Sequence, residues 1–173
     1  MMKINNVIYF GALVISFSIS FMTQSADINI TANLIQNPPC DIAGSDGPDQ
    51  PIKVPFGEVG ITKINGVNYQ QDFALTLSCG TGLGNEVVLY LEYRGMKASF
   101  DDKALQASQP NLGIRLYHEG VVIAPNTGTK ITMSDNGTTT LPLYAVPVKN
   151  SIPSAILYED DFTATASVEM NYP

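Results

Sequence analysis

The sequence predicts an all-β sandwich built as one domain. Short runs that alternate apolar and polar residues lie between clusters of Gly, Asn, Asp and Pro, which is the pattern of half-buried strands joined by turns. The chain has 173 residues, of which 45% are hydrophobic and 14% are charged. This composition supports one ordinary core and argues against a coiled coil or a disordered chain.

The net charge of the chain limits its partners. Nine basic residues stand against sixteen acidic residues, which gives a formal net charge of -7. A protein that binds the phosphates of a nucleic acid or an anionic membrane needs the opposite balance. We therefore expect no nucleic-acid partner.

Residues 1–25 have the organisation of a secretory signal peptide. Lys3 supplies a short positive start, the run Val7–Met22 is almost wholly apolar, and small residues follow it. Cleavage after Ser25 or after Ala26 fits this pattern, and we favour Ser25. The alternative is an uncleaved anchor, but a membrane-spanning helix needs about 20 apolar residues with clearer flanking charge. We expect an exported protein.

The first strand candidate of the exported chain forms an N-terminal arm. Alternation puts Ile28, Ile30, Ala32 and Leu34 on one face, and the run ends where Pro38 and Pro39 remove backbone donors. The pattern predicts a half-buried strand, but it does not say whether this strand completes its own sheet or that of another molecule.

Cys40 and Cys79 are the only cysteines. In an oxidising compartment such a pair most simply forms a disulfide, which adds about 3–4 kcal/mol by the loop-entropy model. Two cysteines and the single histidine, His118, are too few for a zinc site. No pattern in the sequence indicates a catalytic residue, a cofactor or a metal, so we do not expect an enzyme.

Further strands are expected along the rest of the chain. Besides Ile28–Ile35, the clear candidates are Phe73–Ser78, Glu86–Tyr93, Leu112–Tyr117, Thr138–Val146 and Phe162–Tyr172. Weaker candidates are Ile52–Phe56, Val121–Ile123 and Lys130–Met133. Only Asp101–Gln109, which contains Ala104, Leu105 and Ala107, favours a helical turn or two.

The last strand candidate ends one residue before the final Pro173. Its alternation faces six apolar side chains one way: Phe162, Ala164, Ala166, Val168, Met170 and Tyr172. A strand with one buried face usually pairs along both edges, but no later segment of this sequence can cover its far edge. Earlier strands could already flank it on both sides, so this pattern also leaves two arrangements open.

Taken in order, several segments resemble the pilin subunits of chaperone–usher pili, of the type 1 and P pilus class, and most closely their minor tip or adaptor subunits. The segments that carry this resemblance are the arm ending in Pro38-Pro39-Cys40, Val54-Pro55-Phe56-Gly57, Leu75-Thr76-Leu77-Ser78-Cys79, Leu112-Gly113-Ile114-Arg115-Leu116-Tyr117 and the final run from Phe162 to the penultimate Tyr172. Together they cover the whole exported chain.

The resemblance implies an incomplete immunoglobulin-like sandwich of six strands that lacks the last one. It divides the chain into a signal peptide (1–25), a donor-strand extension (26–39) and a pilin domain (40–173). It implies a groove beside the final strand, filled first by a periplasmic chaperone and then, at the outer-membrane usher, by the arm of a neighbouring pilin or adhesin subunit. Both open arrangements would then be intermolecular.

By the same resemblance, Ile28, Ile30, Ala32 and Leu34 form the donor strand. Ala32 stands where the family usually has glycine, although counting back from Cys40 points to Asn33 instead. The strand at the groove edge carries Phe162, Ala164, Ala166, Val168, Met170 and Tyr172, and basic residues of the chaperone would hold the carboxylate of Pro173. At Asp160 the family usually has glycine.

The resemblance therefore predicts a minor structural subunit of a pilus on the bacterial surface, which supports cell adhesion. Three alternatives remain at the sequence level. The chain could be the major rod subunit, a terminator, or a small secreted β-sandwich lectin. A terminator lacks a working donor arm, whereas this chain retains an alternating one.

Overall fold

The computed structural model describes residues 39–48, 50–80, 87–133 and 137–172. All of these residues belong to the compact unit Gln36–Pro173. The expected strand Ile28–Ile35 and the arm that contains it therefore lie outside the described residues.

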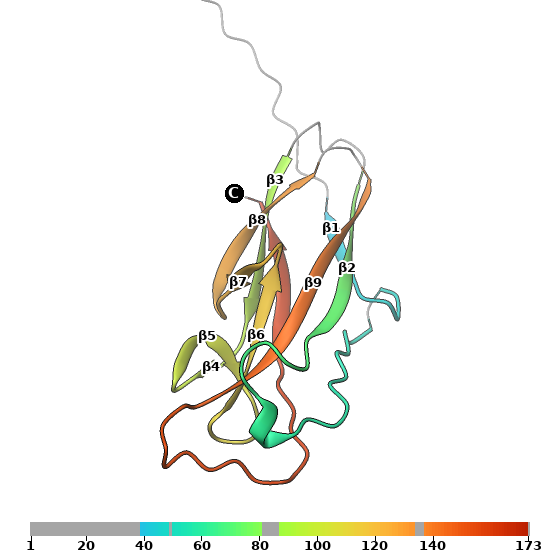
Figure 1. Ribbon diagram of the computed structural model, residues 1–173. Coiled ribbons are helices and arrows are strands. Elements are labelled where there is room, and N and C mark those ends of the chain that lie inside the picture. The colour runs from blue at the N-terminus through green and yellow to red at the C-terminus, as the bar shows by residue number, and fades with distance from the viewer. Residues whose placement is uncertain (1–38, 49, 81–86, 134–136, 173) are drawn as a thin grey trace, which may run out of the picture. The chain divides into compact units, whose positions relative to one another are not determined.

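Two antiparallel sheets make up the described unit (Figure 1). The larger sheet has the strand order β1-β2-β9-β6-β5-β4 with β7 beside β6, and the smaller has the order β10-β3-β8. The strands are β1 (Cys40–Ala43), β2 (Gln71–Cys79), β3 (Val87–Arg94), β4 (Lys97–Ala98), β5 (Asp101–Gln106), β6 (Leu112–His118), β7 (Val121–Ile123), β8 (Thr127–Met133), β9 (Thr138–Lys149) and β10 (Ser167–Asn171).

The core lies where the inward faces of both sheets meet. Leu75 and Leu77 of β2 pack in one apolar cluster with Leu89 and Leu91 of β3, and none of the four is more than 2% exposed. Each pair is two residues apart because successive side chains of a strand point to opposite faces. The prediction of an all-β sandwich is confirmed.

A disulfide fastens the first strand to the second. Cys40 and Cys79 are directly opposite each other in the antiparallel pairing of β1 with β2, with their Cα atoms 4.1 Å apart. The two cysteines are 39 residues apart in the sequence. The disulfide therefore joins the start of β1 to the end of β2 within the larger sheet.

Several expected strands are present in the structure at nearly the expected bounds. The segments expected over Phe73–Ser78, Leu112–Tyr117 and Thr138–Val146 are β2, β6 and β9. The described part of Glu86–Tyr93 is β3, while Glu86 itself lies outside the described residues. The described residues contain ten strand segments where the resemblance implies six main strands, because short segments such as β4 and β7 extend the larger sheet.

The expected helical turn over Asp101–Gln109 is wrong, because Asp101–Gln106 is strand β5. In the sequence, the close spacing of Ala104, Leu105 and Ala107 favours a helical turn. In the structure, Ala104 and Leu105 are both buried. In the structure Ala104 packs with Ala98 and Val148, whereas Leu105 joins the main core. The strand therefore has a packed partner on each of its faces.

Two expected strands lack part or all of their pairing. Ile52–Phe56 is not a strand, and the expected Phe162–Tyr172 is a strand only from Ser167 to Asn171. Their side chains nevertheless alternate as predicted, with every second residue half-buried. The sequence pattern predicted the direction of these side chains but not the absence of backbone partners.

Candidate functional site

An apolar groove of about 1690 Å³ opens into the core of the described unit. Its floor consists of core side chains from both sheets, among them Leu75, Leu91, Ile114 and Leu143. A groove of this kind exposes surface that a finished sandwich would cover with another strand.

The first wall of the groove is the segment of residues 50–60, which runs from the β1 region to the short 3-10 turn η1 (Ile61–Lys63) (Figure 1). Ile52, Val54 and Phe56 are half-buried and pack on the core, whereas the residues between them are exposed. Within the described ranges, the backbone of residues 51–59 makes no hydrogen bond. The segment is an extended edge without a neighbour.

Prolines explain why this wall is not a strand. Pro51 and Pro55 stand at exposed positions of the alternation and have no N–H to donate to a ladder. Proline is tolerated on edge strands and excluded from central ones. The segment therefore keeps strand-like alternation without being paired into the larger sheet.

The second wall is the run that leads into β10. Phe162, Ala164, Ala166 and Val168 line the groove and are half-buried, with exposed residues between them. Strand β10 pairs with β3 along one edge, and no described strand pairs with its other edge. This second wall therefore also presents an edge on which another strand could pair.

An aromatic contact joins the two walls. The rings of Phe56 and Phe162 have centroids 6.0 Å apart and are tilted by 44°. This spacing is within the range of favourable aromatic pairs. The walls are thus linked through side chains at this point of the groove.

A second cavity of about 530 Å³ lies beside the groove. Ile42 and Val168 line both cavities, and Met170 lines the second one. The two cavities are therefore neighbours along β10, and β1 borders the second one.

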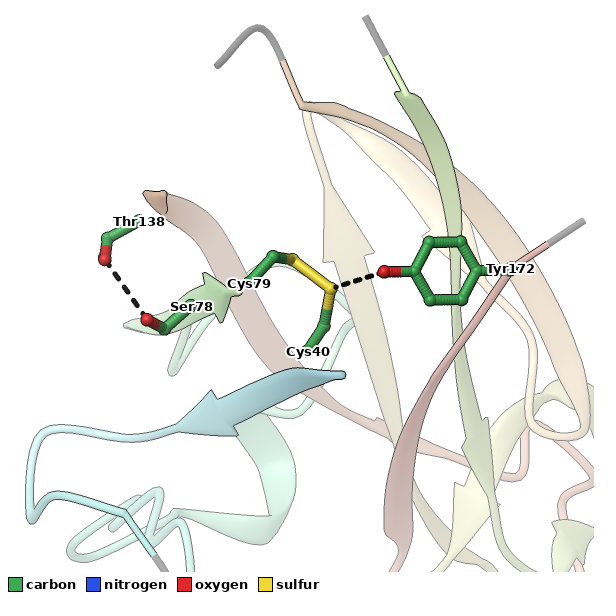
Figure 2. The surroundings of a disulfide bond; sticks show 5 residues. All are labelled: Cys40, Ser78, Cys79, Thr138 and Tyr172. Carbon is green, nitrogen blue, oxygen red and sulfur yellow. Dashed lines mark hydrogen bonds between the residues drawn. A yellow bond between two sulfur atoms is a disulfide. The ribbon is translucent and has the colours of Figure 1, made fainter. Parts of the chain in front are cut away.

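Tyr172, at the end of β10, makes a hydrogen bond to the disulfide sulfur of Cys40 in β1, as Figure 2 shows. Its hydroxyl lies 3.3 Å from the Sγ of Cys40. A disulfide sulfur carries no proton, so the tyrosine donates the hydrogen bond. Burial raises the pKa of Tyr172 above its ordinary value of 10.0, so the hydroxyl remains a donor further into alkaline solution. The contact joins the end of β10 to the disulfide.

The predicted residues of the final strand therefore lie together along one edge of the groove: Phe162, Ala164, Ala166, Val168, Met170 and Tyr172. Pro173 and the predicted donor residues Ile28, Ile30, Ala32 and Leu34 lie outside the described residues. The disulfide between Cys40 and Cys79 is present.

Sequence reasoning missed the role of the first wall. The sequence predicts Ile52–Phe56 only as a weaker strand candidate. The alternation of this segment, together with Pro51 and Pro55, could have indicated an edge without a strand partner. The acidic loop Glu159-Asp160-Asp161 also lines the groove.

Two other kinds of feature, metal-ligand groups and membrane-spanning helices, are absent from residues 39–48, 50–80, 87–133 and 137–172. These ranges contain no group of three His, Cys, Asp or Glu side chains placed to hold a metal ion. Within the same ranges, no helix is both long and apolar enough to cross a membrane.

Solved structures with the same architecture are pilus subunits. The P pilus rod subunit PapA superposes with a TM-score of 0.63 at 24% identity, over 78% of this chain and 99% of PapA. The P pilus adaptor subunit PapF superposes with a TM-score of 0.55 at 25% identity, over 80% of this chain and 98% of PapF. The fold is that of a pilin.

Sequence comparisons agree with the fold. Residues 23–173 match the family model described as fimbrial protein. The uncharacterized fimbrial-like protein YfcQ of Escherichia coli strain K12 is 32% identical over 156 residues, which is 88% of this chain and 92% of that protein. The chain therefore belongs to the fimbrial protein family, as a subunit of the chaperone–usher type.

Proposed function

We propose that this protein is a minor structural subunit of a pilus that polymerises by donor-strand exchange. The observation that carries the proposal is the apolar groove between residues 50–60 and 161–172, whose edges lack strand partners within the described chain. A strand laid between these edges would satisfy their backbone groups and cover the half-buried apolar side chains of the two walls.

The energetics favour an alternating apolar strand as the occupant. Each Ile or Leu side chain that enters the groove contributes about 1.5–3 kcal/mol when fully buried. Backbone pairing adds about 0.5–1.5 kcal/mol for each hydrogen bond. Exchange of one such strand for a better-fitting one therefore needs no nucleotide hydrolysis.

Two kinds of donor would use the groove in succession. A periplasmic chaperone would lend a strand first and would hold the Pro173 carboxylate, and the arm of another subunit would replace that strand at the outer-membrane usher. This chain's own arm, residues 26–39, would carry Ile28, Ile30, Ala32 and Leu34 into the groove of a neighbouring pilin or adhesin subunit.

The remaining assignments follow from this role. Residues 1–25 would direct export into the periplasm and be removed, and residues 40–173 would form the pilin domain. We assign the subunit a minor adaptor position near the pilus tip, in support of cell adhesion. Its similarity to PapF, an adaptor subunit of the P pilus, supports this position.

Co-expression with periplasmic pilus chaperones tests the proposal. We expect a stable one-to-one complex by native mass spectrometry, and aggregation or polymerisation of the chain when no chaperone is present. A soluble, cooperatively folded monomer without chaperone would contradict the proposal and would favour a self-contained secreted domain such as a lectin.

A further inference from the structure

Residues 158–166, the part of the second wall that precedes β10, have no strand partner among the described residues. Within the described ranges, their only backbone-to-backbone hydrogen bond runs from the N–H of Ser108 to the carbonyl oxygen of Thr163, over 2.7 Å. Other contacts must therefore hold this part of the wall in its extended course.

The loop between β5 and β6 supplies these contacts. The side-chain amide of Gln109 donates to the carbonyl oxygens of Tyr158 and Asp160, each over 3.0 Å. The side-chain oxygen of Gln109 accepts from the backbone N–H of Tyr158 over 3.2 Å. The hydroxyl oxygen of Ser108 accepts from the backbone N–H of Thr163 over 3.0 Å. Two neighbouring residues thus take the place of a strand ladder along this part of the wall.

The loop is itself held in place. The side-chain amide of Gln106 donates to the carbonyl oxygens of Ala107, Gln109 and Leu112, over 2.8, 3.0 and 3.1 Å. The backbone N–H of Ala107 also donates to the carbonyl oxygen of Leu112, and both of these residues are buried in one apolar cluster. The wall is therefore bonded to a loop that is anchored in the core.

These contacts cover the edge of the wall that β3 covers further along. Strand β3 pairs with β10, and Gly95 follows β3 directly. A Cβ atom added to Gly95 would lie 3.3 Å from the carbonyl oxygen of Thr165. Ser108 bonds to Thr163, two residues earlier. The strand β3, Gly95 and Ser108 therefore follow one another along a single edge.

The opposite edge of this part of the wall stays free. Thr163 directs both its N–H and its carbonyl oxygen to Ser108. Successive residues of an extended chain direct their backbone groups to opposite edges, so those of Phe162 and Ala164 point the other way. No hydrogen bond of the described chain involves the backbone groups of Phe162 or Ala164. An incoming strand could pair with them there.

We infer that Ser108 and Gln109 are positioning residues for strand uptake, because they hold residues 158–163 extended before a strand enters the groove. The inference rests on the proposed function. Gln109 lines the groove, but both polar atoms of its side chain already bond to the wall, so it acts through the wall. A wall that is ordered in advance reduces the conformational entropy that binding has to offset.

Retention of a donor peptide tests the inference. The full exported chain is filled with a labelled peptide of residues 26–37, and loss of the label is followed in excess unlabelled peptide. We expect Gln109→Ala to accelerate the loss about three- to tenfold and Ser108→Ala about two- to fivefold, since weakened contacts act mainly on dissociation. Ser108→Thr keeps the hydroxyl and should restore the slow loss.

Asn65→Ala is the matched control. The side-chain oxygen of Asn65 accepts from the N–H groups of Val67 and Asn68, and this residue is exposed and lines neither cavity. The variant should lower the unfolding free energy without changing peptide loss. Hydrogen exchange of the filled protein should be faster at residues 158–163 in Gln109→Ala and unchanged at residues 167–171.

Two outcomes overturn the inference. One is unchanged peptide loss in both Gln109→Ala and Ser108→Ala, and the other is equal acceleration by Asn65→Ala and Gln109→Ala, which would show only a general loss of stability. Failure of the natural chain to take up any peptide would instead contradict the proposed function.

Discussion

Individual hydroxyl groups stabilise both the groove and the core. Tyr172 joins the end of β10 to the disulfide sulfur of Cys40. Tyr93, only 3% exposed, donates its hydroxyl to the carbonyl oxygen of Ile123 over 2.9 Å. Each contact joins segments far apart in the chain, so each can be tested by removing a single oxygen atom.

Replacing Tyr172 with Phe should weaken the fastening of β10 to β1. We expect the unfolding free energy of the chaperone-free, donor-peptide-filled protein to fall by about 0.5–1 kcal/mol, since sulfur is a weak acceptor. Urea unfolding measures this. Tyr158→Phe is the control, because Tyr158 is 65% exposed. Equal stability of the two variants would show that the contact contributes nothing.

Stability should fall in alkaline solution because of Tyr93. Burial, with a smaller contribution from the charge of Asp101, raises the pKa of Tyr93 above its ordinary value of 10.0. The unfolded chain therefore loses this proton at a lower pH than the folded chain does. The stabilisation is complete below pH 10 and is lost as the pH rises towards the folded pKa. Urea unfolding from about pH 9 to 11.5 should show this decline, and Tyr93→Phe should make it shallower, whereas Tyr158→Phe should not.

Two extended segments of the described chain have a backbone edge without a strand partner, and these edges determine where another strand could pair. Residues 51–59 and the run 162–172 both alternate half-buried and exposed side chains. Only residues 167–171 of these are paired as a strand, with β3. An incoming strand would thus find its inward pockets and part of its backbone partners already in place.

A charge on the groove face of β10 should block strand uptake. Val168→Asp places a carboxylate among apolar side chains, and we expect the rate of donor-peptide uptake to fall at least about tenfold because an unpaired buried charge is costly. Ser167→Asp, on the exposed face and opposite Arg94, should change it little. If Val168→Asp prevents folding, Val168→Ala should still slow uptake measurably. Unchanged uptake in both Val168 variants would remove β10 from the acceptor site.

Local pattern predicted the regular elements well and the exceptions poorly. Alternation located β2, β3 and the first half of β9, where one face lies in the core, although β6 and the end of β9 also contain runs of consecutive buried residues. It failed at β5, where Ala104 and Leu105 face different clusters. The groove walls were predicted only as side-chain directions, because the presence of a backbone partner depends on the rest of the fold. The acidic residues that line the large cavity could not be predicted as a set, since Glu58 and the 159–161 loop are far apart in the sequence.

The proposed function assigns the whole molecule an acceptor groove and a donor arm, and these two functions should be separable. Deleting Ala26–Asn37 should leave the chaperone complex intact, because the groove lies in residues 40–172, but should stop the subunit from filling a neighbour's groove. Analytical ultracentrifugation of subunit mixtures measures both properties.

Ile30→Asp gives a milder version of the same separation, because it introduces a charge into the donor strand while keeping its length. We expect slower incorporation and an unchanged chaperone complex. If the deletion abolishes chaperone binding while addition to a neighbour persists, the assignment of donor and acceptor is reversed.

The two walls of the groove come from opposite parts of the chain, residues 40–60 and residues 162–172. A product cut short before Phe162 would possess the disulfide and most of the larger sheet, but it would have only one of the two walls. Under the proposed strand exchange, a donor strand would bind such a truncated subunit poorly because one wall of the groove is missing, and the truncated subunit would not enter the filament.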